Sequence, residues 1–477
     1  MDIGASVVRS LKWMAFLRFS GQFVTWAVTL IVIRLLTPED YGLMALAMVV
    51  IGLVNILNEL GLGAALVQQK KVDEETLGEA MALLTIVNGL FFLAIYGIAP
   101  VAAQWFGEPD LTSALRVLAV AFLVMPFVSM PTALLQRAMA FRRKSVADLA
   151  RNLGASLFTL VLAWQGFGVW ALLFGFVANQ ALNAIALSIA AGRTVPPRFR
   201  FANIRPLIGF SGWVTASRIV SYAYDQSNKI VTGRFLGTGA AGLITVANDI
   251  ASLPMLKIQS ILNEVSFSAL SRIQENRAEF VKLYLKGVRV LNVFAVPVFF
   301  GISAVAPEIV LVFLGEQWRG AIVPMQILSL VIPLRILSNM LAPALMGAGL
   351  ARVSFTNTVV GVLLIPPAAL VGVQWGVVGV AIAWAIAYPV VFLINAWRTL
   401  RALEIPGGAY YRALAGPLAS GVLMLVCCYG VRHYSGLPSG SITILAVTAV
   451  TGAVVYVTTM VAVARTQARE TLRVVWR

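Results

Sequence analysis

Long apolar segments recur along the whole chain, and they restrict its fold more than any other feature. Each holds about twenty mainly apolar residues, the length that an α-helix needs to cross a hydrocarbon core of about 30 Å. Hydrophobic residues make up 60% of the chain and charged residues only 12%, and the mean hydropathy is +0.88. A soluble domain carries about 25% charged residues. The sequence therefore predicts an all-α integral membrane protein with about fourteen transmembrane helices.

The predicted spans form two series separated by a polar break. The first series lies near residues 13–36, 43–67, 80–103, 115–135, 146–164 and 168–191. The second lies near residues 212–235, 243–262, 288–314, 321–346, 357–373, 376–397, 413–431 and 442–464. No short apolar core with a small-residue cleavage site precedes the first span, so we interpret that span as a retained helix.

The basic residues predict the orientation of the chain in the membrane. The formal net charge of +16 could suggest a nucleic-acid partner, but the position of the charges argues against one. With the N-terminus in the cytoplasm, about 25 Lys and Arg fall in cytoplasmic segments and about 5 on the outer face, in agreement with the positive-inside rule. We therefore expect both termini in the cytoplasm. Basic clusters such as Arg137/Arg142/Arg143/Lys144 are interpreted as topogenic, with a supplementary role in holding anionic lipid headgroups as the alternative.

An internal repeat relates the two series of spans. A shift of 200 residues pairs Trp13 with Trp213 and Gly42 with Gly242, and a shift of 208 pairs Gly107 with Gly315 and Gly168 with Gly376. An even number of spans separates the members of each pair, so both copies enter the membrane in the same direction. Two parallel lobes of this kind are a frame for alternating access, which makes transport the expected function.

The repeat also predicts the domain organisation. Two parallel six-helix lobes should enclose a central cavity, with two further helices at the C-terminus. The predicted parts are an N-terminal lobe at residues 1–191, a cytoplasmic connector at 192–208, a C-terminal lobe at 209–400, and two additional helices with a basic cytoplasmic tail at 401–477.

Polar side chains inside the spans are candidates for substrate contacts, because a charge at mid-bilayer costs at least about 2.5 to 3.5 kcal/mol. They recur at three- and four-residue steps, which place them on one face of the first and of the seventh span. The candidates for lining a substrate cavity are Arg18, Gln22, Arg218, Tyr222, Lys229 and Arg335, and the guanidinium of Arg218 is suited to an anionic phosphate. The alternative for Arg18 is a side chain that extends to the nearby cytoplasmic surface.

Acidic residues in the spans are candidates for coupling transport to an ion. Glu59, Asp225 and Asp249 could each take up the Na⁺ or H⁺ that drives the cycle. Asp225 precedes Lys229 by four residues, so the alternative for this acid is an ion pair within one helix. The alternative for Glu59 is capture by a neighbouring Arg or a backbone donor. No cofactor is expected apart from such an ion.

Several motifs together resemble polysaccharide flippases of the MATE-like exporter superfamily. They are RLLTPEDYGLMALA followed by ELGLGAALVQ, then GRFLGTGAAGL, ALSRIQENRAEF and LGEQW, in this order along the chain. The resemblance implies a bacterial inner-membrane protein that moves an undecaprenyl-diphosphate-linked oligosaccharide from the cytoplasmic to the periplasmic leaflet. It also implies a positively charged central cavity in which the candidate residues hold the diphosphate and sugars. Polysaccharide polymerase and export machinery are the expected partners. Many relatives have an aspartate where this chain has Asn228, which leaves Asp225 as a candidate substitute.

Other functions fit the sequence less well than transport of lipid-linked sugars. A polysaccharide polymerase or ligase needs room for acid and base groups on the outer face, but the outer segments are short, and His433 is their only histidine. Clusters of His and Cys ligands for a metal are missing from the sequence, as is a phosphate-binding P-loop, so an enzyme is not expected. A multidrug cation exporter would favour acids over bases in its cavity. A lipid II flippase differs from the favoured function only in the pattern of its motifs.

Arg218 provides a test of the basic cavity that the sequence predicts. The Arg218→Ala variant should export fewer lipid-linked repeat units while remaining inserted, because a guanidinium that holds phosphate oxygens does not hold the fold together. Surface polysaccharide in a strain that carries only this variant measures the effect. A normal amount of surface polysaccharide would contradict this role for Arg218.

Overall fold

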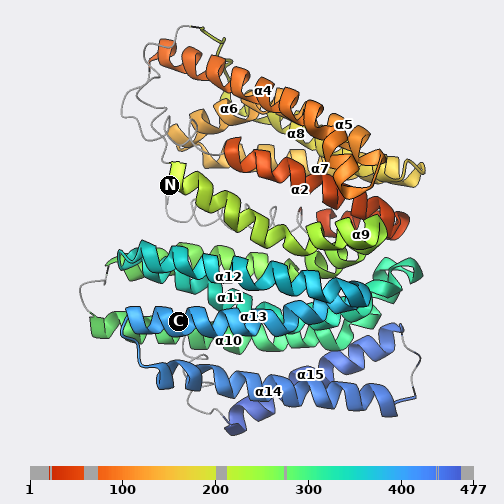
Figure 1. Cartoon of the computed structure of the whole chain (residues 1–477), viewed down its shortest axis with the longest axis vertical. Helices are drawn as coiled ribbons and strands as arrows, with labels where there is room; N and C mark the ends of the chain where they lie inside the picture. The colour runs from red at the N-terminus through yellow and green to blue at the C-terminus, as the bar shows by residue number, and fades with distance from the viewer. Residues whose placement is uncertain are drawn as a thin grey trace, which may run out of the picture. The chain divides into compact units, whose positions relative to one another are not determined.

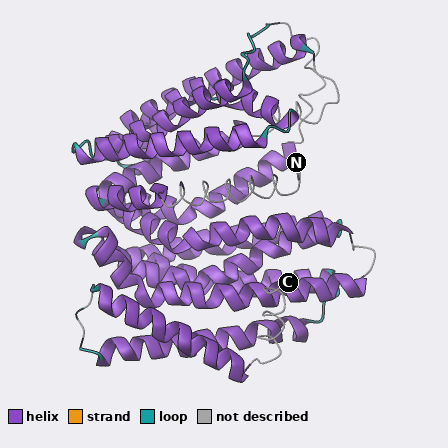
Figure 2. Ribbon diagram, turned by 180° about the vertical axis from the view of Figure 1, so that it is seen from behind, coloured by secondary structure: helices purple, strands orange, loops and turns teal. Residues whose placement is uncertain are grey.

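The computed structural model describes residues 21, 24–58, 73–199, 212–272, 277–436, 438 and 440–463, and all regular structure among them is helical (Figure 2). In the N-terminal part the helices are α2 (Pro38–Asn58), α4 (Glu74–Phe106), α5 (Asp110–Val124), α6 (Pro126–Arg137), α7 (Phe141–Trp164), α8 (Val169–Ala191) and α9 (Gly212–Arg272). They continue with α10 (Arg277–Glu308), η2 (Ile309–Leu314), η3 (Glu316–Ala321), α11 (Ile322–Gly347), α12 (Ala351–Gly372), η4 (Val373–Trp375), α13 (Gly376–Ala402), α14 (Gly407–Tyr434) and α15 (Ile442–Val463).

The membrane-protein class is confirmed. Within the described residues, eleven stretches are long and apolar enough to cross a membrane, and a shorter apolar helix covers Val24–Leu35. Two of the eleven stretches are interrupted at a glycine with a positive φ angle, Gly237 in α9 and Gly376 at the junction of η4 and α13. Every predicted span overlaps one of these helices, while the total of fourteen stays a prediction.

The chain divides into two compact units. Unit 1 comprises Met1–Tyr222 with Gly237–Gly242, and unit 2 comprises Ala223–Leu236 with Leu243–Arg477. The division falls inside α9, which contributes segments to both units, and not in the predicted connector at 192–208. In unit 2 the two last helices, α14 and α15, pack against each other and against α10 (Figure 1). The predicted domain boundaries stay predictions.

Each unit has its own apolar core. The core of unit 1 lies where α2, α4, α5 and α8 meet, around the fully buried Leu46, Leu115 and Leu173. The core of unit 2 lies among α10, α11, α13 and the start of α14, around Leu341 and Trp384. Because lipid tails are as apolar as these side chains, close packing rather than exclusion of water holds such helices together.

Local sequence explains where two of the helices begin. At the start of α2, the Thr37 N–H donates to Asp40 Oδ2 at 2.9 Å, and the Asp40 N–H donates to Thr37 Oγ1 at 3.3 Å. This reciprocal cap satisfies amides that would otherwise lack partners. At the start of α4, Asp73 Oδ1 accepts from the Thr76 N–H at 2.8 Å. Hydrogen bonds from the Thr76 side chain and backbone hold the pKa of Asp73 below its usual range.

The paired glycines of the repeat meet in unit 1. A Cβ on Gly42 would overlap the Thr238 carbonyl, and a Cβ on Gly242 would overlap the Pro38 carbonyl. Only glycine permits so close an approach of two backbones. The contact, together with a 3.3 Å hydrogen bond from the Thr238 N–H to Glu108 Oε1, fixes Gly237–Gly242 to the first unit.

The glycines of two further repeat pairs have positive φ angles. Gly107 and Gly315 have φ angles of 76° and 103°, and Gly168 and Gly376 have φ angles of 54° and 70°. Side chains other than glycine rarely adopt such angles. Gly168 and Gly376 also have similar ψ angles, −135° and −159°, so this pair supports the repeat that the sequence alignment indicated. Gly107 and Gly315 differ in ψ, at 22° and 171°, and share only the positive φ.

A buried ion pair attaches α14 to α10. Arg432 donates to Glu308 Oε1 at 2.7 Å and to the Ala304 carbonyl at 3.3 Å. Only 1% of the Glu308 side chain and 16% of the Arg432 side chain are exposed. Removing one member of such a pair leaves an uncompensated charge in an apolar environment. The pair therefore anchors the C-terminal helices to the rest of unit 2.

Glu308→Gln should lower the free energy of unfolding by about 3 to 5 kcal/mol, because it leaves the Arg432 charge without its counter-ion. Thermal unfolding of the purified protein in one detergent measures the loss. Glu316→Gln is the matched control. Its partner Arg319 is 66% exposed and Glu316 itself is 70% exposed, so this ion pair should contribute at most about 1 kcal/mol. Equal losses in the two variants would contradict an anchoring role.

Candidate functional site

Arg335 on α11 is the centre of a polar cluster inside unit 2. Its guanidinium donates to Asn248 Oδ1 on α9 at 3.1 Å, and its Cζ lies 5.0 Å from the centre of the Trp384 ring on α13. Trp384 is buried and Arg335 is half-buried. An arginine held against an aromatic face in this way keeps its charge while part of its hydration is removed.

The second part of this cluster comes from the first half of α9 and from α13. Asp225 interacts electrostatically with Arg335, and its side chain is exposed. The neighbouring Tyr224 is hydrogen-bonded to Tyr388, which is also hydrogen-bonded to Ser338 on α11. Three helices thus place one acid, one base and two phenols together. The phenols add hydrogen-bonding groups beside Asp225 and Arg335 without adding charge.

Lys229 extends the cluster along α9. Its Nζ lies 4.0 Å from Asp249 Oδ1, and the Asn248 amide donates to the same oxygen at 3.2 Å. The ion pair between Asp225 and Lys229 that the four-residue spacing permits is not formed, because the bend at Gly237 brings the second half of the helix back toward the first. The two acids are therefore divided between two bases, Asp225 toward Arg335 and Asp249 toward Lys229.

The remaining predicted site residues have different positions. Arg218 and Tyr222 belong to unit 1, where the Arg218 side chain is exposed. The Tyr222 hydroxyl lies 3.1 Å and 3.0 Å from the carbonyl oxygens of Met48 and Val49 on α2, so it is engaged in attaching α9 to α2. Arg18, Gln22 and Glu59 lie outside the described residues.

Asn228 stands where the sequence departs from the motif pattern. Its side-chain oxygen is buried without a hydrogen-bond partner in the described part of the chain, as are the hydroxyls of Ser227 and Thr232 on the same helix. Buried acceptors of this kind need water, an ion or a ligand group. Asn228 therefore retains the capacity to accept a hydrogen bond, although it lacks the charge of an aspartate.

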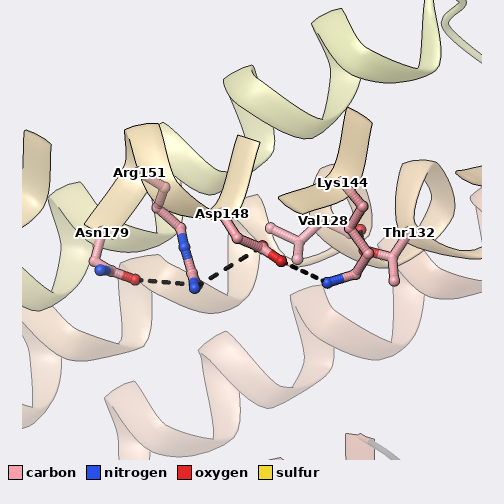
Figure 3. Close-up of polar contacts among 6 residues, drawn as sticks. All are labelled: Val128, Thr132, Lys144, Asp148, Arg151 and Asn179. Carbon is pink, nitrogen blue, oxygen red and sulfur yellow. Dashed lines mark hydrogen bonds and ion pairs between the residues drawn. The ribbon is translucent and has the colours of Figure 1, made fainter. Parts of the chain in front are cut away.

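A second polar cluster, in unit 1, was missed by the sequence analysis. Lys144, Asp148 and Arg151 lie in a row along α7, and Asn179 on α8 continues the row (Figure 3). Lys144 Nζ lies 2.8 Å from Asp148 Oδ2, an Arg151 nitrogen lies 4.0 Å from Asp148 Oδ1, and Arg151 donates to Asn179 Oδ1 at 3.5 Å. The three- and four-residue spacing could have indicated the row, but Lys144 was assigned to the topogenic cluster.

Comparison with known proteins identifies the family. A family profile with the description "Polysaccharide biosynthesis protein" matches residues 31–323, more than half of the chain. The chain belongs to this family. Within it, the chain is 27% identical to the succinoglycan biosynthesis transport protein ExoT of Rhizobium meliloti over 94% of this chain and 92% of the relative. It is 24% identical to the lipopolysaccharide biosynthesis protein WzxC of Escherichia coli K12, over 80% of this chain and 79% of the relative.

The fold is that of known transporters. A solved structure of the lipid II flippase MurJ, in an inward closed conformation, superposes with a TM-score of 0.74, covering 95% of this chain and 99% of that chain at 14% identity. An identity this low concerns the fold alone. The resemblance that the motifs indicated is confirmed by the family match and by these relatives.

Asp148 is the only acid drawn between the two bases of the unit 1 cluster, which makes it a test of how that cluster is stabilised. Asp148→Asn should lower the free energy of unfolding by about 1 to 3 kcal/mol, because Lys144 and Arg151 then repel each other in partly apolar surroundings. Thermal unfolding in detergent measures this. The double variant Lys144→Met/Asp148→Asn removes the repulsion and should recover most of the loss. Failure to recover would contradict the electrostatic explanation.

Proposed function

We propose that this protein moves undecaprenyl-diphosphate-linked oligosaccharide repeat units across a bacterial inner membrane, from the cytoplasmic to the periplasmic leaflet. Membership of a polysaccharide biosynthesis family supports the proposal, as do two relatives named for succinoglycan and lipopolysaccharide biosynthesis. The positive-inside bias of the sequence supports termini in the cytoplasm. Catalytic chemistry is not part of the proposal, and polysaccharide polymerase and export machinery are its expected partners.

The Arg335 cluster is the observation that carries the proposal. Inside an apolar protein, a half-buried guanidinium against Trp384 is a suitable group for a diphosphate, since its planar donors match phosphate oxygens in pairs. Aromatic faces and amide groups such as Asn248 are suited to sugars and to the bridging oxygens. The likeness to a lipid II flippase concerns the fold, so it favours no particular substrate.

Ion coupling follows from competition for Arg335. When a diphosphate binds this guanidinium, Asp225 loses its electrostatic partner. A carboxylate without a counter-charge in an apolar protein takes up a proton or a metal cation to compensate. Substrate binding and uptake of H⁺ or Na⁺ would thus be linked at neighbouring residues. Asp249, which faces Lys229, is the second acid that could act in this way.

Arg335→Ala should reduce translocation about tenfold or more, because it removes a charge-assisted contact worth about 1.5 to 3 kcal/mol. Arg335→Lys should restore part of the rate, since it keeps the charge but loses the planar contact with Trp384. The measurement is the loss of lectin-accessible, lipid-linked oligosaccharide from one leaflet of proteoliposomes, with and without a sodium or proton gradient.

Arg401→Ala is the matched control for this experiment. Arg401 also lies on a helix of unit 2 and over a tryptophan, with its Cζ 5.7 Å from the Trp397 ring, but both side chains are exposed. The control should translocate at the wild-type rate. An Arg335→Ala variant that inserts normally and translocates as fast as the wild type would contradict the proposed function of the cluster.

A further inference from the structure

A groove between α7 and α8 is not used by the proposed transport site. It has a volume of about 570 Å³, within the range of small-molecule sites, and lies where α7 begins and α8 ends. Apart from two guanidinium groups, those of Arg142 and Arg143, its lining is aliphatic. It combines an apolar channel with a cationic end, an amphipathic arrangement that a lipid molecule matches.

Small residues create the apolar part of the groove. Ala147 and Ala150 on α7 face Ala186 on α8, and the absence of larger side chains leaves the space open. The larger flanking residues Val146 and Ile189 are 58% and 75% exposed. In a membrane-spanning helix pair, aliphatic side chains this exposed are in contact with lipid. The groove is therefore open to acyl chains of the bilayer.

The two arginines at the end of the groove differ from the lysine that follows them. Lys144 forms an ion pair with Asp148, with its Nζ 2.8 Å from Asp148 Oδ2. Arg142 and Arg143 are exposed, and neither forms an ion pair with a carboxylate among the described residues. Two adjacent guanidinium groups with ten donors in all favour a phosphate group, and basic pockets between helices on the cytoplasmic side are suited to anionic headgroups.

We propose that this groove binds an anionic phospholipid of the cytoplasmic leaflet, with the phosphate on Arg142 and Arg143 and an acyl chain along the alanines. The steps of three and four residues from Arg142 and Arg143 to Val146, Ala147 and Ala150 place headgroup and chain contacts on one side of α7. The proposed occupant is a bulk lipid, and binding of the polyprenyl carrier instead is an outcome that the experiment below distinguishes.

Native mass spectrometry of the full-length protein tests this site, with phosphatidylglycerol and phosphatidylcholine as the probes. The wild type should bind phosphatidylglycerol more tightly than phosphatidylcholine, and Arg142→Gln/Arg143→Gln should weaken phosphatidylglycerol binding about tenfold. Arg352→Ala is the matched control: Arg352 is exposed in the first turn of α12, the helix of unit 2 that corresponds to α7, and its loss should change binding little.

A second variant separates the groove from the charge. Ala150→Trp fills the apolar channel while both arginines remain, and it should weaken phosphatidylglycerol binding at least about fivefold. Equal binding of the two lipids, or unchanged binding in the double arginine variant, would overturn the proposal. Displacement of the bound lipid by a lower concentration of undecaprenyl phosphate would also overturn it, because the groove would then belong to the carrier. Failure here leaves the Arg335 experiment unaffected.

Discussion

A charge placed among apolar helices must find a partner, and this requirement organises both units. In unit 2, Arg335 donates to an amide on α9, lies against an aromatic ring on α13 and is attracted by a carboxylate on α9. In unit 1, Arg151 lies 4.0 Å from the Asp148 carboxylate and donates to Asn179, while its buried Nε has no hydrogen-bond partner among the described residues. Where both members of an ion pair are buried, as in Glu308–Arg432, the pair attaches one helix to another. Where the partner can be exchanged for a ligand, the same physics gives a binding site.

The two units use this principle differently, although the sequence relates them by a repeat. Gly168 and Gly376, each at the start of a helix, have similar backbone conformations in the two copies. The two polar clusters do not correspond: Arg335 is on α11 in unit 2, whereas the row of Lys144, Asp148 and Arg151 in unit 1 is on α7. A backbone with a positive φ angle accepts few residues other than glycine. A polar group can occur on a different helix in the two copies, provided that its partner lies next to it there.

The candidate site could be predicted in part. Arg335, Lys229, Asp225 and Asp249 were selected because charges in apolar spans are costly, and all four lie in one cluster. The aromatic partners Trp384 and Tyr388 were not selected, because a tryptophan or tyrosine in a membrane helix is common and has no periodic signal. Arg151 was missed since its partner Asn179 is on another helix, 28 residues away.

Sequence alone determined the class of the protein, the position of nearly every described helix, and the family. These depend on the hydropathy of contiguous residues and on motifs whose order is local, so the tertiary structure adds little to them. Only the tertiary structure decided which charges are paired. Because the chain bends at Gly237, Lys229 forms its ion pair with Asp249 rather than with Asp225. Arg335 donates a hydrogen bond to Asn248, which is 87 residues away in the chain. Such contacts depend on how helices pack, and packing is fixed by the shape of whole faces rather than by the spacing of residues along one helix.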